Sequence, residues 1–162
     1  MSALVAFVIK DDIKYEKLVE LSKDLISYSL KNNIGVIFNF LGYAEELMRS
    51  LNAGLYFSVS DDFLQLNSEF LTVSEINDLE SEQGKHYFYE KFTFLDNIYK
   101  RLIEFGCKKI EFIISCNGNP ECITDEFLIK DKGGKAIVEI LYDALIEVKD
   151  KFAYSFPELY LI

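Results

Sequence analysis

The feature that most constrains the fold is the run ALVAFVI at residues 3–9, which is apolar throughout and is followed directly by Lys10, Asp11 and Asp12. A strand with one wet face alternates apolar and polar residues, whereas a strand covered on both faces is apolar continuously. The run is also far shorter than the ~20 residues of a membrane-spanning helix. Residues 3–9 are therefore predicted to form a central strand of a sheet.

A helix and a second strand are predicted next. Leu18, Leu21, Leu25 and Ile26 recur at helical spacing, which predicts a helix from about residue 13 to residue 32. IGVIFNFL at 34–41 is rich in β-branched and aromatic residues and predicts a strand. Strand, helix and strand in succession indicate a βαβ unit, in which the second strand lies parallel to the first as its neighbour.

The remaining elements are predicted from the same kinds of pattern. Residues 43–54 are predicted to form a short helix and residues 55–60 a strand. Residues 61–73 are predicted to form one or two short edge strands. Residues 74–84 are predicted to form a short acidic helix capped by Ser74. A helix is expected over 87–105, with Gly106 at its end. Strands are expected over 108–115 and 123–130. A last helix is expected after Gly133 and Gly134, and a final edge strand is expected within 155–162.

These elements predict an α/β fold, with α+β as the near alternative. We expect one globular domain over residues 1–162, with a less regular acidic segment at about 61–84. Its core is expected to be a single mixed β-sheet of five or six strands that starts as a βαβ unit and ends in antiparallel strands. With 162 residues, half of them hydrophobic, the chain can bury a core of its own.

The net charge of −10 is distributed unevenly. Residues 50–84 contain seven acidic residues and no lysine or arginine. A surface of this sign repels nucleic acid and anionic lipid and attracts basic proteins or cations. Residues 3–9 lack the flanking features of a signal peptide, and three cysteines suit a reducing compartment. A cytoplasmic protein is therefore expected.

The stretch SCNGNPECITDEF at 115–127 raises the question of a metal or redox site. Asn-Gly and Asn-Pro favour a turn, so 108–116 and 122–130 are predicted to pair as a β-hairpin with Cys116 opposite Cys122. The two could be reduced thiols in an apolar setting, a cross-strand disulfide, or part of a zinc site. The thiol interpretation is favoured, because a structural zinc site has four ligands and only Cys107 and His86 could supply the other two.

Other candidate sites lack part of the pattern that their chemistry needs. His86 is the single histidine, and no nucleophile accompanies it in a known arrangement. The turn at Gly133 and Gly134 has adjacent glycines and Ala136 in place of the hydroxyl residue of a phosphate-binding loop. Asp61, Asp62 and Glu69 do not follow the calcium-loop spacing. No cofactor, no metal site and no enzymatic activity are expected.

The acidic segment 61–82 remains as a solvated loop or as a docking face for a basic protein. A small, acidic, single-domain protein of this character resembles the immunity proteins of bacterial contact-dependent growth inhibition and related polymorphic toxin systems. The resemblance implies a protein that binds a cognate toxin domain, often a basic nuclease, and blocks it sterically. It lies in the general character of the chain and transfers no functional residue.

The partner-binding residues are therefore expected from charge and aromatic character alone. Aromatic anchors carry much of the binding energy of interfaces, and Tyr87 is a further candidate anchor. The predicted set is Asp61, Asp62, Phe63, Glu69, Phe70, Glu75, Asp78, Glu80 and Glu82.

Two other functions stay open. A small-molecule or nucleotide-binding enzyme would use the loops at the strand ends, near Lys10–Asp12, Leu41–Tyr43 and the turn at Gly133 and Gly134. A self-assembling subunit would use an exposed apolar edge such as 155–162.

Overall fold

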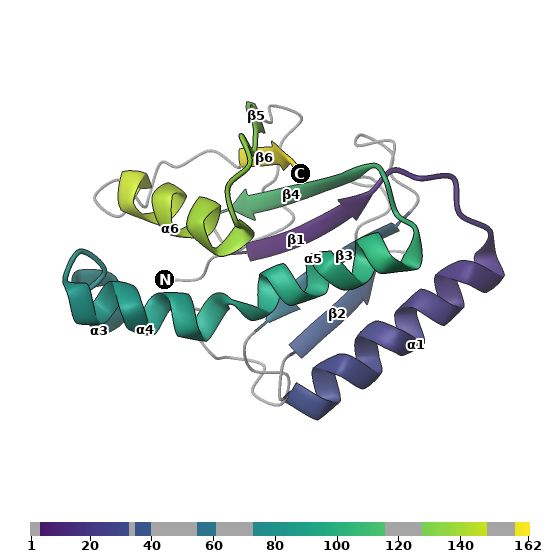
Figure 1. The fold of residues 1–162 in the computed structure, drawn as a ribbon, viewed down its shortest axis with the longest axis horizontal. Coiled ribbons are helices and arrows are strands. Elements are labelled where there is room, and N and C mark those ends of the chain that lie inside the picture. Colours follow the sequence, from purple (N-terminus) through teal and green to yellow (C-terminus); the bar gives the residue numbers. More distant parts are fainter. Residues whose placement is uncertain (1–3, 33–34, 40–54, 61–72, 116–127, 149–157) are drawn as a thin grey trace.

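A computed structural model describes residues 4–32, 35–39, 55–60, 73–115, 128–148 and 158–162 of the chain (Figure 1). The elements in chain order are β1 (Leu4–Ile9), α1 (Tyr15–Asn32), β2 (Gly35–Asn39), β3 (Leu55–Ser60), α3 (Val73–Asn77), α4 (Glu82–Phe92), α5 (Phe94–Phe105), β4 (Ile110–Ser115), β5 (Leu128–Asp131), α6 (Ile137–Val148) and β6 (Glu158–Leu161). The expected helix over 43–54 and the expected edge strands over 61–73 lie outside the described residues, except for Val73.

The strands form a single mixed sheet in the order β2-β3-β1-β4-β6-β5. The prediction of helices packed on one mixed sheet is confirmed. Among the described strands, β5 and β6 pair in parallel and the other four pairings are antiparallel. This predominance of antiparallel pairs places the sheet close to the α+β alternative.

Strand β1 lies between β3 and β4, as the continuous apolar run predicts. Its residues Val5, Phe7 and Ile9 are fully buried in the core beneath the helices, and Val8 on the opposite face is also fully buried. Phe7 lies directly opposite Phe112 of β4, with ring centroids 5.1 Å apart. The prediction of a central strand buried on both faces is confirmed.

The expected pairing of the first two strands is wrong. Strands β1 and β2 run in the same direction, but β3 lies between them and is antiparallel to both. Phe57 of β3 occupies the register position opposite Phe7 on one side and opposite Phe38 on the other. The strand-helix-strand pattern indicated the relative direction of the two strands, but a later segment of the chain takes the place between them.

The expected hairpin of 108–116 with 122–130 is also wrong. Strand β4 pairs with β1 and β6, while β5 pairs with β6, so the C-terminal strand separates β4 from β5. For the same reason, β6 is an internal strand and does not provide the free edge that self-assembly through 155–162 requires. Cys116 and Cys122 lie outside the described residues.

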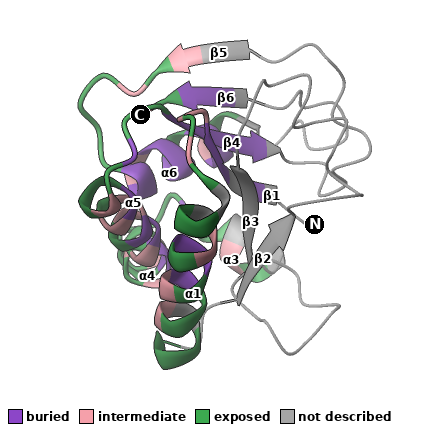
Figure 2. Cartoon of the chain, turned by 90° about the vertical axis from the view of Figure 1, so that its right-hand side faces the viewer, coloured by how far each residue is buried: buried purple, intermediate pink, exposed green. Residues whose placement is uncertain are grey.

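The helices cover one face of the sheet (Figure 2). Their apolar stripes join the inward residues of β1 and β4 in one core that includes Leu21, Leu25, Phe88, Leu102 and Leu141. Ile26, expected to be part of the stripe of α1, is instead 42% exposed. No described helix is long and apolar enough to cross a membrane.

The expected helix over 87–105 is two helices. The Thr93 hydroxyl donates a hydrogen bond to the carbonyl of Tyr89, one turn earlier, and the Thr93 amide donates to the same carbonyl at 3.0 Å. A threonine hydroxyl that bonds back in this way bends a helix, and Thr93 separates α4 from α5. Gly106, with φ 109°, ends α5 as predicted, because the left-handed conformation costs a glycine little.

The acidic helix expected over 74–84 ends earlier, at Asn77, and α4 begins at Glu82. Ser81 is the N-cap of α4: its side chain accepts a hydrogen bond from the Gly84 amide at 2.9 Å. The expected cap at Ser74 is wrong, because Ser74 is the second residue of α3, and the observed cap is Ser81, near the end of the expected helix. It divides that segment into α3, a turn and the start of α4.

A carboxylate from α5 caps α6. Asp96 Oδ1 accepts from the Ile137 amide at 2.8 Å, and Oδ2 accepts from the Val138 amide at 3.0 Å. A carboxylate at a helix N-terminus satisfies amides that have no partner within the helix and also favours the helix dipole. Asp96 therefore joins α5 to α6 beside the core.

Replacing Asp96 with alanine is expected to lower the free energy of unfolding by about 1–2 kcal/mol, because two amides of α6 lose their acceptor. The measurement is urea unfolding, with Glu104→Ala, an exposed acidic position on the same helix, as control. Equal stability of the two variants would contradict the capping role.

Candidate functional site

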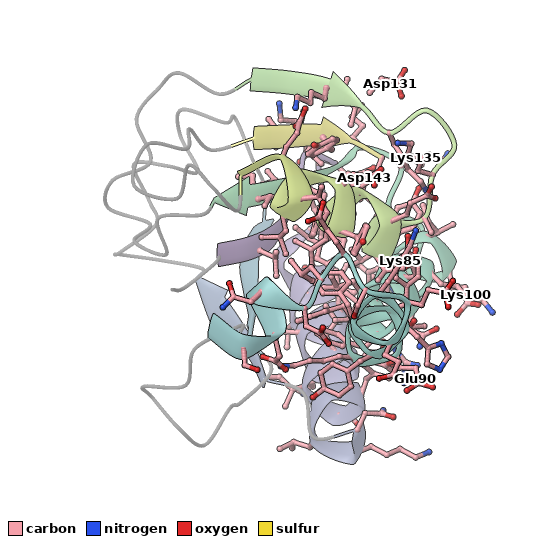
Figure 3. All side chains as sticks on the ribbon, turned by 90° about the vertical axis from the view of Figure 1, so that its left-hand side faces the viewer. Lys85, Glu90, Lys100, Asp131, Lys135 and Asp143 are labelled. Carbon is pink, nitrogen blue, oxygen red and sulfur yellow. The ribbon has the colours of Figure 1, made fainter. Side chains whose placement is uncertain are left out.

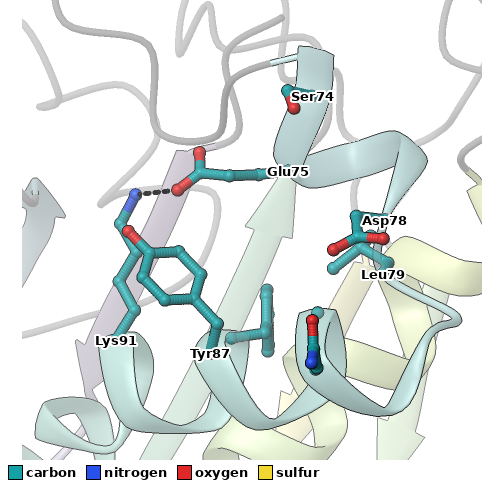
Figure 4. A pocket seen from close by; sticks show the side chains of 9 residues that line it. Ser74, Glu75, Asp78, Leu79, Tyr87 and Lys91 are labelled. Atoms are coloured by element: carbon teal, nitrogen blue, oxygen red, sulfur yellow. Dashed lines mark hydrogen bonds and ion pairs between the residues drawn. The ribbon is translucent and has the colours of Figure 1, made fainter.

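The corner between α3 and α4 encloses a pocket of about 230 Å³ (Figure 4). One wall comes from α4: Gln83, Gly84, Tyr87, Phe88 and Lys91. The other wall comes from α3 and the turn after it: Ser74, Glu75, Asp78 and Leu79. We call this pocket, with the exposed acids Glu80 and Glu82 beside it in sequence, the acidic corner.

A close backbone contact sets the shape of the acidic corner. A Cβ atom added at Gly84 would lie 1.9 Å from the carbonyl oxygen of Asp78, far inside any permitted contact. Only glycine lets the first turn of α4 approach the preceding turn this closely. The Ser81 hydroxyl supports the contact, since it lies 2.9 Å from both the carbonyl oxygen and Oδ1 of Asp78.

The floor of the pocket is apolar and its rim is charged. Leu79 and Phe88 are each 1% exposed, and the Leu79 carbonyl accepts a hydrogen bond from the Tyr142 hydroxyl of α6 at 2.8 Å. On the rim, Lys91 Nζ lies 3.1 Å from Glu75 Oε1. Figure 4 shows this ion pair and Tyr87 on one side of the opening and Asp78 on the other.

Two groups of the rim remain accessible. Tyr87 is 53% exposed. Ser81 bonds Oδ1 of Asp78, whereas Oδ2 has no hydrogen-bond partner among the described residues. The pocket thus offers an aromatic ring and a carboxylate oxygen above an apolar floor.

The structure describes four of the predicted partner-binding residues. Glu75 and Asp78 line the pocket of the acidic corner, Glu82 is exposed in the first turn of α4, and Glu80 is exposed in the turn between the helices. Five predicted residues lie outside the described part of the chain: Asp61, Asp62, Phe63, Glu69 and Phe70.

A second groove, of about 550 Å³, adjoins the acidic corner through Glu80. It lies over α6 and the strands β5 and β6. Lys135 Nζ contacts Asp143 at 2.8 Å and Lys130 Nζ lies 3.8 Å from Glu147, and Figure 3 shows Lys135 and Asp143 on this side of the molecule. Sequence reasoning did not include Asp143 or Glu147, although their spacing of four residues places them on one exposed stripe of the helix.

The loops expected to serve an enzyme have structural partners instead. The amides at the start of α6 that a phosphate would need are bonded to Asp96. Asp11, in the loop after β1, accepts hydrogen bonds from the amides of Lys108 and Lys109 at 2.8–3.0 Å. Leu41–Tyr43 lies outside the described residues.

His86 and Cys107, the described histidine and cysteine, have contacts and surroundings typical of structural residues. His86 is exposed and its Nε2 lies 2.9 Å from Glu90 Oε1, one turn along α4. Burial raises the pKa of the Cys107 thiol to about 11, and the negative charge of Asp11 adds to this shift. In the described ranges, no three metal-ligating side chains of the histidine, cysteine or acidic type lie together.

One buried acid lies outside the acidic corner. Glu111 of β4 is 6% exposed, and its Oε1 contacts Lys10 Nζ at 2.9 Å, while its Oε2 has no hydrogen-bond partner in the part of the chain that the structure describes. Its cross-strand neighbours, Val8 and Leu161, are apolar. The pair joins the end of β1 to β4 and has the character of a structural ion pair.

Comparisons of the chain with protein-family models, with curated proteins and with solved structures find no match. The functional argument therefore depends on the geometry and charge of the acidic corner.

Substituting Gly84 with alanine is expected to lower the free energy of unfolding by about 1–3 kcal/mol, because the added methyl group collides with the Asp78 backbone. Gln83→Ala, in the same turn at an exposed position, is the control. Urea unfolding measures both. A Gly84→Ala protein as stable as the control would show that the contact does not shape the acidic corner.

The Cys107 thiol is expected to resist Ellman's reagent at pH 8 in the folded protein, since a pKa of about 11 leaves almost no thiolate. Because the folded pKa is raised, this group stabilises the fold fully below its unfolded pKa and loses that contribution as pH rises toward 11. A Cys116→Ser/Cys122→Ser background isolates the signal. Rapid labelling without urea would contradict the assignment.

Proposed function

We propose that the protein is a binding inhibitor of the immunity-protein type. In this proposal it binds the basic surface of a cognate toxin domain, or another basic protein, through the acidic corner and blocks that partner sterically. No chemistry and no cofactor are required. The protein would act in the cytoplasm of a bacterial cell that must resist the toxin.

The observation that supports the proposal best is the local excess of acidic residues at the acidic corner. Asp78, Glu80 and Glu82 are exposed and lie within five consecutive residues, in a stretch of 35 residues that has no lysine or arginine. Such a field accelerates association with a basic partner. The exposed Tyr87 beside these acids supplies an amphipathic ring of the kind that anchors protein interfaces.

Further acidic residues line the second groove. Asp143 and Glu147 of α6 line the same groove as Glu80 of the turn. Lys135 and Lys130 balance part of that charge. In this proposal the acidic corner and the second groove together form the contact area for the partner.

The proposal predicts that a basic polypeptide purifies with the tagged protein from its native cell at low salt. In Glu80→Lys/Glu82→Lys, the association rate with that polypeptide is expected to fall at least about tenfold at low ionic strength, with a weaker dependence on salt. Surface plasmon resonance over a series of salt concentrations measures both effects.

A matched control is Glu16→Lys/Glu104→Lys, which makes the same change in net charge. Glu16 lies in the first turn of α1 as Glu82 lies in the first turn of α4, and Glu104 is exposed on α5. Unchanged association rates for the control support a localised docking face. Equal slowing by both variants, or the absence of any basic partner, would contradict the proposal.

A further inference from the structure

The pocket of the acidic corner has the composition of a receptor for one long cationic side chain. We propose that it binds a single arginine side chain of the partner protein, with the guanidinium between Asp78 and Tyr87 and the aliphatic stem over Leu79 and Phe88. The inference depends on the proposed function for the source of the arginine. The ligand chemistry itself follows from the pocket.

The size and floor of the pocket select the kind of ligand. A volume of about 230 Å³ is below the range of about 300–1,000 Å³ that is usual for sites of drug-sized molecules, and it suits one side chain. The floor formed by Leu79 and Phe88 is apolar. Arginine and lysine bury an apolar stem while their charged head remains at the rim, so they fit such a pocket.

The charge of the rim requires a cation. Glu75 is already neutralised by Lys91, at 3.1 Å. Asp78 has one oxygen bonded to Ser81 and the other without a hydrogen-bond partner among the described residues. An apolar ligand would desolvate this carboxylate without compensation, and an anion would be repelled. One positive charge balances the pocket.

The chain contains an internal example of the proposed contact. Arg101 donates two hydrogen bonds to Asp24, at 3.0 and 2.8 Å, while its guanidinium lies 4.7 Å from the centre of the Tyr28 ring. The acidic corner presents the same two groups, a carboxylate and an exposed tyrosine ring, without their arginine. A guanidinium binds a carboxylate at two points and stacks on aromatic rings, whereas the strongly hydrated ammonium of lysine does neither as well. This difference favours arginine over lysine.

The test uses N-acetyl-arginine amide, with the neutral isostere N-acetyl-citrulline amide as the matched probe. Titration of the ¹⁵N-labelled protein is expected to shift the amide signals of Asp78, Gly84 and Tyr87 in a saturable manner, with a dissociation constant of the order of millimolar. Citrulline amide is expected to bind at least about tenfold more weakly, because it cannot make the charge-assisted bonds.

Two variants with the same loss of charge separate a pocket from general attraction. Asp78→Asn keeps the acceptor for Ser81 and is expected to weaken arginine amide binding about tenfold, whereas Glu82→Gln, outside the pocket lining, should change it by less than about twofold. Equal binding of citrulline amide, equal effects of the two variants, or no saturable shifts at the corner would overturn the inference.

Failure of this inference is distinguishable from failure of the proposed function. If Asp78→Asn and Tyr87→Ala leave partner affinity unchanged while Glu80→Lys/Glu82→Lys weakens it, the arginine pocket is wrong and the docking face stands. If arginine amide binds at the corner but no basic partner is found, the pocket stands and the inhibitor function is wrong.

Discussion

The contact between Phe7 and Phe112 is the interaction on which the rest of the structure depends. The two rings lie opposite each other on the central strands β1 and β4, fully buried on the face that receives the helices. Each large side chain removes much apolar area from water, and their tilted packing contributes further. The stripes of α1, α4, α5 and α6 all pack into the core that surrounds this pair. The sheet therefore places α4, and with it the acidic corner, at a defined position.

The acidic corner combines a rigid backbone with exposed charge. Gly84 permits the close approach to Asp78, Ser81 caps α4, and Tyr142 holds the Leu79 carbonyl from α6. These contacts fix the pocket walls before any partner arrives. A preorganised site loses less conformational entropy on binding than a flexible acidic loop would. In the proposed function, this preorganisation would favour binding at the described part of the acidic segment.

Local sequence patterns predicted the features that depend on neighbouring residues in the chain, such as a buried strand and the end of a helix. The unbroken apolar run at 3–9 indicated a strand with two covered faces, and Gly106 indicated the end of a helix; both are confirmed. Strand neighbours were not predictable in this way. Turn-forming residues near Cys116 favoured a hairpin, yet β6, from the far end of the chain, takes the edge of β4 through pairs such as Ile113 with Leu159. Such pairings depend on distant segments that compete for the same hydrogen bonds.

The candidate site was also predicted only in part from the sequence. Charge composition pointed to Glu75, Asp78, Glu80 and Glu82, and the structure brings two of them into a pocket. The contribution of α6 was not visible, because only the fold brings Asp143 and Glu147 next to Glu80. Nor could the close contact at Gly84 be inferred, since it depends on the turn that Ser81 and Asp78 form.

The central claim is that a basic protein binds at the acidic corner. It is tested most directly by photo-crosslinking in the native cell, with p-benzoylphenylalanine in place of Tyr87 or, as control, in place of Leu30, an exposed apolar residue of α1. The account predicts one basic polypeptide crosslinked in high yield from the position of Tyr87 and not from that of Leu30. No crosslink from Tyr87, or the same products from both positions, would contradict it.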